Sequence, residues 1–181
     1  APLSGCCRGF LVRGHNTNLK SSVELCHKKF RDTSDGSQSR KETTVVPIGL
    51  NFDWKDKVLG TARSDGKLQV NCGRLALGNA AFFNADASTV RTSGRYTKLL
   101  FDITRTQQVA TRIAAHVRVQ EQLGRKNLDS SEDTLIGGAD SVRAYPNVEA
   151  YSDKTVVRQY ELRFAGADAT PHLLCDLAQG R

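Results

Sequence analysis

The chain has 181 residues, enough for one domain with a sizeable core if it is soluble. It carries 26 Lys and Arg against 19 Asp and Glu, a formal net charge of +7. This balance permits an anionic partner, but the basic residues are spread along the chain. The tightest clusters are Lys28-Lys29-Phe30-Arg31 and Arg40-Lys41, which are shorter than the stripe expected of a nucleic-acid footprint. Nucleic acid is therefore not a predicted partner, and a transmembrane helix is excluded because no run of eighteen apolar residues exists.

The cysteines and histidines do not form a metal-binding pattern. The five cysteines are Cys6, Cys7, Cys26, Cys72 and Cys175, and the four histidines are His15, His27, His116 and His172. None of the cysteines stands in a CxxC pair, and the histidines are scattered, whereas a zinc site needs ligands at short spacing. No nucleophile elbow or catalytic triad spacing is present either. We expect no enzyme activity, metal or cofactor.

Alternation of apolar and polar residues is the main structural signal in the chain. It begins weakly in residues 21–30 and becomes clear from Val46 to Trp54, where every second side chain is apolar. It then recurs along the chain, weakly at 66–75 and clearly at 96–105, 111–120 and 157–164, with a last run at 171–178. The pattern predicts about seven strands of roughly 9–11 residues, the length that crosses a bilayer at a tilt.

The connections between these strands differ in length. The link at 105–109 is short, whereas the links at 31–43, 55–64, 77–94 and 124–155 are long and polar. Such asymmetry is typical of an outer-membrane barrel with an apolar face toward lipid and a polar face toward a wet lumen. A soluble antiparallel sheet with one wet face explains the alternation equally well. The residues alone therefore leave open an all-β antiparallel transmembrane barrel, partial in extent, and a soluble basic β-sheet module that binds nucleic acid or an anionic protein.

A glycine-rich segment favours the first of these alternatives, the transmembrane barrel. Residues 124–153 read GRKNLDSSEDTLIGGADSVRAYPNVEAYSD, and the strand with ELRF follows at 161–164. The segment resembles the sixth extracellular loop of the two-partner secretion transporters, the TpsB family that exports haemolysins and filamentous haemagglutinins. Its motif has the form GG-x-x-x-VR-[GA]-[YF]. The matching residues are Gly137, Gly138, Val142, Arg143, Ala144, Tyr145 and Pro146. The resemblance extends over residues 16–181, and the loop motif is its most specific part.

The resemblance implies a location, a partner and a role for the loop. Such transporters lie in the bacterial outer membrane, combine soluble POTRA domains with a barrel of about sixteen strands, and export a large TpsA-like exoprotein. The sixth loop folds back into the pore, where its arginine pairs with an aspartate in an F-x-D-x-G motif. By position the arginine is Arg143 and the aspartate is Asp176, and Glu161 on the intervening strand is a possible second partner. A lumenal guanidinium stays charged and gains most from a bidentate carboxylate.

The chain departs from the family pattern at several points. Leu174 and Ala178 replace the aromatic residue and the glycine around Asp176. We expect residues 1–181 to be a partial barrel domain without a POTRA domain, with outer-membrane lipid around it. About seven strands are fewer than the eight of the smallest bacterial barrels, so this chain alone is expected to be inactive in export. A related barrel that assembles other barrels shares the arginine loop, but the NLDSSE and RAYP segments favour secretion.

Overall fold

A computed structural model describes residues 4–34, 37–78, 80–89, 91–125, 127, 134–136, 142–143, 150–166 and 171–180. In chain order the elements are β1 (Ser4–Arg13), β2 (Thr17–Ser34), β3 (Ser37–Asp56), β4 (Ala62–Leu77), α1 (Ala80–Ser88), β5 (Gly94–Ala110), β6 (Ile113–Gly124), β7 (Thr134–Ile136), β8 (Ala150–Ser152), β9 (Lys154–Phe164) and β10 (His172–Gly180). The described part of the chain is therefore almost entirely β-structure.

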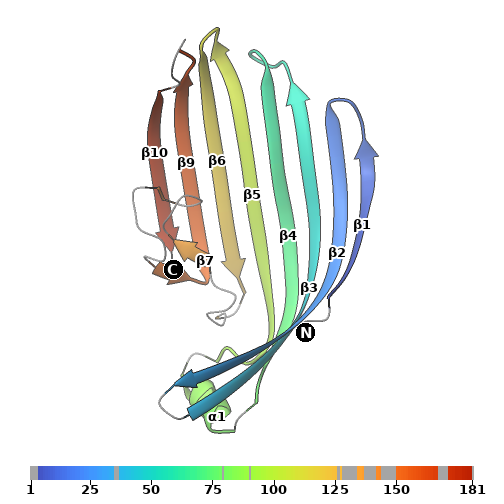
Figure 1. Cartoon of the computed structure of the whole chain (residues 1–181), viewed down its shortest axis with the longest axis vertical. Coiled ribbons are helices and arrows are strands. Elements are labelled where there is room, and N and C mark those ends of the chain that lie inside the picture. The colour runs from blue at the N-terminus through green and yellow to red at the C-terminus, as the bar shows by residue number, and fades with distance from the viewer. Residues whose placement is uncertain are drawn as a thin grey trace.

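Eight of the strands form one curved antiparallel sheet. Its order is β1-β2-β3-β4-β5-β6-β9-β10, so each strand lies beside its neighbour in sequence once the small β7-β8 ribbon is set aside. Figure 1 shows these strands side by side in a single layer, with β1 and β10 at its two margins. The sheet is open in this structure and is not closed into a barrel.

The register of the sheet separates an apolar face from a polar face. One row of directly paired residues across β2 to β6 is entirely aliphatic, and it consists of Val23, Ile48, Val70, Leu99 and Leu123. We call the side of the sheet that carries this row the apolar face. A row on the opposite side, the polar face, consists of Lys20, Asn51, Lys67, Asp102 and Gln120. Successive side chains of a strand point to opposite sides, so the alternation in sequence becomes two chemically different surfaces.

The apolar face is exposed and the buried core is small. Only Val45 and Tyr96 form a buried apolar cluster among the described residues. Large apolar side chains with a third or more of their surface exposed lie along the apolar face of most strands, among them Val23, Ile48, Leu50, Trp54, Leu68, Leu123, Tyr160, Leu162, Phe164, Leu173 and Leu177. Extended apolar surface of this kind needs a non-aqueous neighbour.

Two glycines allow aromatic rings to lie flat on the sheet. A Cβ atom added to Gly66 would come within 2.6 Å of the ring of Phe52, its direct partner on β3. On the polar face, a Cβ atom on Gly73 would collide with the ring of Tyr96, its partner on β5. Each ring covers backbone that lacks a side chain of its own, which joins neighbouring strands by packing as well as by hydrogen bonds.

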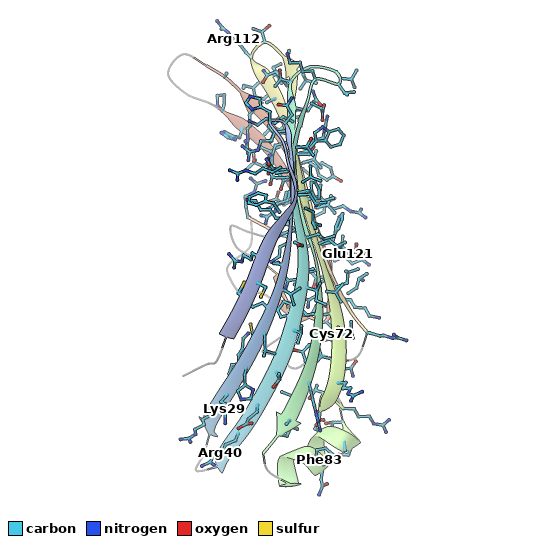
Figure 2. All side chains as sticks on the ribbon, turned by 90° about the vertical axis from the view of Figure 1, so that its right-hand side faces the viewer. Lys29, Arg40, Cys72, Phe83, Arg112 and Glu121 are labelled. Carbon is cyan, nitrogen blue, oxygen red and sulfur yellow. The ribbon has the colours of Figure 1, made fainter. Side chains whose placement is uncertain are left out.

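The two ends of the sheet differ in their connections. Short turns join β3 to β4 and β5 to β6 at one end, while α1 and the β2–β3 hairpin project from the other end (Figure 1). Figure 2 shows the same division in a second view, with Arg112 at the short-turn end and Lys29, Arg40 and Phe83 at the opposite end. The segment that contains β7 and β8 also starts at the second end, between β6 and β9. Short connections at one end and long ones at the other are the asymmetry of outer-membrane barrels.

The prediction of an all-β antiparallel fold is confirmed, and its details need correction. The sheet has eight strands and not about seven, because the sequence pattern missed β1. The register of β1 shifts between Phe10 and Val12, and this irregularity breaks the alternation that marks a strand. Several strands also exceed the expected 9–11 residues, and the longest, β3, has 20.

Three predicted connections are shorter than expected. Most of the predicted loop at 31–43 continues the β2–β3 ladder, which extends to the pair Ser34 and Ser37. The sequence from Arg31 to Thr43 is polar throughout and shows no alternation, so it resembles a loop. The predicted loop at 55–64 shrinks to 57–61, and the predicted link at 105–109 lies within β5.

The helix α1 was not predicted. Its sequence AAFFNADAS is rich in alanine, the strongest helix former, and it lies in the predicted 77–94 connection. Among the residues that the structure describes, no helix has the length and apolar character needed to cross a membrane.

Candidate functional site: Arg143 and its carboxylate partners

Arg143 binds Asp176 through three hydrogen bonds. The guanidinium donates from Nη2 to Oδ1 at 2.7 Å and from Nε to Oδ2 at 2.9 Å. The backbone N–H of Arg143 also donates to Oδ2 at 3.0 Å. The two side chains therefore form a bidentate pair, the geometry in which a guanidinium binds a carboxylate most strongly.

Glu161 accepts the remaining contact of the Arg143 guanidinium. Its Oε2 atom receives a hydrogen bond from Nη1 of Arg143 at 3.0 Å. Its other oxygen accepts a hydrogen bond from Nε of Arg163 at 2.7 Å and also contacts Nδ1 of His172. Glu161 thus joins a loop arginine to polar groups of β9 and β10.

Burial makes these contacts energetically important. The side chains of Glu161 and Asp176 are only 5% and 6% exposed, and that of Arg143 is 28% exposed. Hydrogen bonds to Asp176 raise the pKa of the Arg143 guanidinium above its ordinary value, although desolvation opposes them. Removing one partner of a buried ion pair costs roughly 3–5 kcal/mol, because the other charge loses both its partner and its water.

The register of β9 and β10 brings the two carboxylates together. Leu174 lies directly opposite Glu161, and Asp176 is two residues further along β10 on the same face of the sheet. The four odd-numbered residues of β9 from Thr155 to Glu161 are all buried, whereas most even-numbered ones are exposed. The buried side is the polar face, so Arg143 reaches the polar face from the loop and not from the apolar side.

The structure describes part of the predicted loop motif. Val142 is buried, with 6% of its surface exposed, and it lies next to Arg143. The motif residues Gly137, Gly138, Ala144, Tyr145 and Pro146 lie outside the described residues. The structure therefore describes Val142 and Arg143 of the motif, together with the predicted partners Asp176 and Glu161.

Arg163 and His172 belong to the cluster but were missed in the sequence. Arg163 is two residues after Glu161, so strand alternation alone places the two side chains on one face. His172 gives no comparable signal, because its proximity to Glu161 depends on how β10 pairs with β9.

A second group of paired charges lies elsewhere on the polar face and was also missed. Asp102 on β5 accepts from Arg118 Nε and Nη2 at 3.1 and 2.8 Å and from Gln120 Nε2 at 3.1 Å. The three side chains come from adjacent strands. Asp102 and Arg118 thus form a second bidentate carboxylate–guanidinium pair on this face.

The cysteines form no disulfide bond, and the candidate metal ligands are dispersed in the described ranges. All five cysteines are free. Within the described ranges, no group of three or more His, Cys, Asp or Glu side chains is arranged to hold a metal ion.

Comparison with known families places this geometry in context. A model of the haemolysin secretion/activation proteins ShlB/FhaC/HecB matches residues 8–179. Searches of curated proteins and of solved structures give no match. Proteins of the matched family are transporters of two-partner secretion in the outer membrane, and they are not enzymes. Since the match spans nearly all of the 181-residue chain, the chain belongs to the ShlB/FhaC/HecB family of haemolysin secretion/activation proteins.

Proposed function

We propose that this chain forms part of the wall of an outer-membrane pore that exports a large haemolysin-, haemagglutinin- or adhesin-like partner protein. The contact of Arg143 with both Asp176 and Glu161 is the observation that carries the proposal. It holds a loop residue on the polar face, the face that lines the lumen in a transmembrane barrel. A loop fixed there narrows the passage and sets the conformation through which a substrate moves.

The two faces of the sheet support a position in a membrane. The apolar face presents aliphatic and aromatic side chains to lipid, while the polar face carries charges that need water or partners. In this proposal residues 1–181 act as a barrel domain, and the segment at about 124–155 is the pore loop. The remaining motif residues, Gly137, Gly138, Ala144, Tyr145 and Pro146, belong to this segment of the sequence.

The open edges bear on the activity of the 181-residue chain. β1 and β10 each pair with one neighbour, and unpaired backbone groups are costly in lipid. We infer that both edges pair with further strands in the working pore, so the 181-residue chain alone does not export protein. Expression of residues 1–181 alone, followed by an export assay, tests this inference, and export by that chain would contradict it.

The central experiment is the substitution Arg143→Ala in the full natural protein, expressed in its source cell. We expect secretion of the partner protein to be lost while the amount of transporter in the outer membrane stays unchanged. Arg112→Ala is the matched control, because Arg112 is exposed in the β5–β6 turn, remote from the loop. Normal secretion by Arg143→Ala would refute the role of the pair.

Asp176→Ala distinguishes the two carboxylate partners. Asp176 accepts three of the four hydrogen bonds that Arg143 donates to carboxylates, so its loss should resemble the loss of Arg143. Normal secretion by Asp176→Ala, together with failure of Glu161→Ala, would assign the anchoring role to Glu161.

A further inference from the structure

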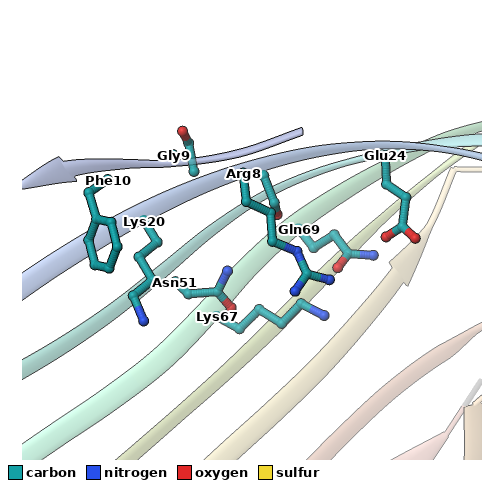
Figure 3. A pocket seen from close by; sticks show the side chains of 10 residues that line it. Arg8, Gly9, Phe10, Lys20, Glu24, Asn51, Lys67 and Gln69 are labelled. Carbon is teal, nitrogen blue, oxygen red and sulfur yellow. The ribbon is translucent and has the colours of Figure 1, made fainter. Parts of the chain in front are cut away.

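A basic pocket lies on the polar face over β1 to β4, near the β1 margin of the sheet. Arg143 contacts the same face at the other margin, on β9 and β10. The volume of the pocket is about 620 Å³, which is within the usual range for ligand sites. The charged lining residues are Arg8, Lys20, Lys67 and Glu24, and the uncharged polar ones are Ser21, Ser22, Asn51 and Gln69. Figure 3 shows the labelled side chains gathered over the strands from β1 to β4.

Strand register explains why these residues meet. Phe10, Lys20, Asn51 and Lys67 are successive partners in one row across β1, β2, β3 and β4. The next row contains Arg8, Ser22, Gly49 and Gln69. Residues that are up to 61 positions apart, from Arg8 to Gln69 (69 − 8), therefore line one surface.

Gly49, in the middle of the second row, has no side chain to fill the pocket. A Cβ atom at Gly49 would come within 2.8 Å of the Ser22 hydroxyl oxygen, so a side chain there would fill the hollow between β2 and β4. Phe10 borders the pocket, and its ring lies 4.9 Å from the Lys20 ammonium and 5.1 Å from the Arg13 guanidinium. The ring helps to hold the Lys20 ammonium at the edge of the hollow.

The cations of this pocket differ in their pairing from Arg118 and Arg143 on the same face. Arg118 and Arg143 are each paired with carboxylates at 2.7–3.0 Å. Within the part of the chain that the structure describes, Arg8, Lys20 and Lys67 have no carboxylate within ion-pair distance. Three such cations and a single Glu24 give the pocket a net positive charge that an external anion can neutralise.

We propose that this pocket binds carboxylate groups of an acidic segment in the exported polypeptide as it passes the polar face. This inference rests on the proposed export function and adds a contact site for the exported chain. The amides of Asn51 and Gln69 and the hydroxyl of Ser22 can pair with peptide groups between the acidic side chains. Glu24 favours a polypeptide over a continuous polyphosphate, because a polypeptide can place a neutral or basic residue beside it.

Peptide binding to the purified protein, as the source cell makes it, tests the site directly. The probe is a fluorescent peptide of ten glutamates, with ten lysines and inorganic phosphate as comparisons. We expect the glutamate peptide to bind, the binding to weaken as salt rises, and the lysine peptide not to bind. The variant Arg8→Gln/Lys20→Gln/Lys67→Gln should bind roughly tenfold or more weakly, since three exposed charge pairs with the peptide are lost.

A second triple variant controls for net charge. Lys28→Gln/Lys57→Gln/Arg112→Gln removes three exposed cations outside the pocket, and we expect wild-type binding. Equal weakening in both triple variants would overturn the pocket and leave only a general charge effect. Displacement of the peptide by phosphate at equal concentration would overturn the polypeptide assignment in favour of a phosphate site.

Export assays separate this inference from the proposed function. If the wild-type protein exports its partner but the pocket variant neither binds the peptide more weakly nor exports more slowly, the pocket assignment is wrong and the export function stands. If the wild-type protein exports nothing while the peptide binds in the pocket, the export function fails and with it the assignment of the ligand to an exported chain.

Discussion

Arg143 and Asp176 are 33 residues apart in sequence and are joined by three hydrogen bonds, two from the guanidinium and one from the backbone N–H. The contact fixes both the side chain and the backbone of Arg143. A loop held in this way is positioned by one residue, so small changes of that residue should have large effects on the loop.

Arg143→Lys should release the loop even though it keeps the positive charge. An ammonium is a point donor and cannot span both oxygens of Asp176 and also reach Glu161. Loss of one charge-assisted hydrogen bond costs about 1.5–3 kcal/mol, which corresponds to roughly a tenfold or greater rise in the released state. The measurement is the rate of cleavage within residues 125–153 by proteinase K added to intact cells.

Arg105→Lys is the control for this substitution. Arg105 forms a comparable bidentate pair with Asp56, but on the other face of the sheet. Its substitution should leave the cleavage rate unchanged. A wild-type rate for Arg143→Lys would mean that charge alone holds the loop.

Gly66→Ala should destabilise the sheet by about 1–3 kcal/mol, the usual cost of overpacking. The new Cβ atom would lie 2.6 Å from the Phe52 ring and 2.8 Å from the backbone oxygen of Asp102, and the backbone cannot move away without disturbing the ladder. The free energy of unfolding in urea, measured after reconstitution in lipid vesicles, reports the effect. Gly9→Ala is the control and should change stability by less than about 0.5 kcal/mol, because nothing lies within 4 Å of its added Cβ atom.

Arg158→Leu should stabilise the protein in a bilayer. Arg158 is paired with Val119 and Leu177 in a row of the apolar face, where a charge meets lipid. An arginine on the lipid face costs up to about 2–4 kcal/mol at the bilayer midplane and much less near its surface. The same urea titration measures the gain, with Arg112→Leu in the β5–β6 turn as control. A loss of stability would instead indicate that Arg158 has a polar partner in the membrane.

Asp86→Ala should loosen the connection between α1 and β5 without reducing export. The Asp86 carboxylate accepts hydrogen bonds from the backbone N–H of Thr92 at 2.8 Å, the Thr92 hydroxyl at 2.6 Å and the backbone N–H of Ser93 at 2.9 Å. Buried groups that lose such an acceptor are destabilised by about 1–3 kcal/mol, so these amides should exchange hydrogen about tenfold faster or more.

Asn84→Ala provides the comparison for this connection. Asn84 lies two residues earlier on α1 with an exposed side chain, so amide exchange should stay at the wild-type rate. A loss of secretion in Asp86→Ala would show that this connection takes part in export, contrary to our expectation.

Alternation in the sequence was sufficient to predict the class of fold and the two faces of the clearest strands. Tyr160, Leu162 and Phe164 alternate with Gln159 and Glu161, and the structure places these two groups on opposite faces of β9. Period-two alternation is a local property, so it can be recognised without knowledge of the partner strand. The same local signal failed at β1, where the register shifts, and in the β2–β3 hairpin, where the sequence from Arg31 to Thr43 is polar throughout.

The partners of each side chain depended on the tertiary structure. The sequence proposed Arg143, Asp176 and Glu161 through a family resemblance, and the structure joins them by hydrogen bonds, while their role in a pore stays a proposal. The positions of Arg163 and His172 beside Glu161, and the meeting of Arg8 with Lys67, follow from strand register. Register depends on long-range pairing of whole strands, so the sequence determined which faces exist and the tertiary structure decided which charges meet on them.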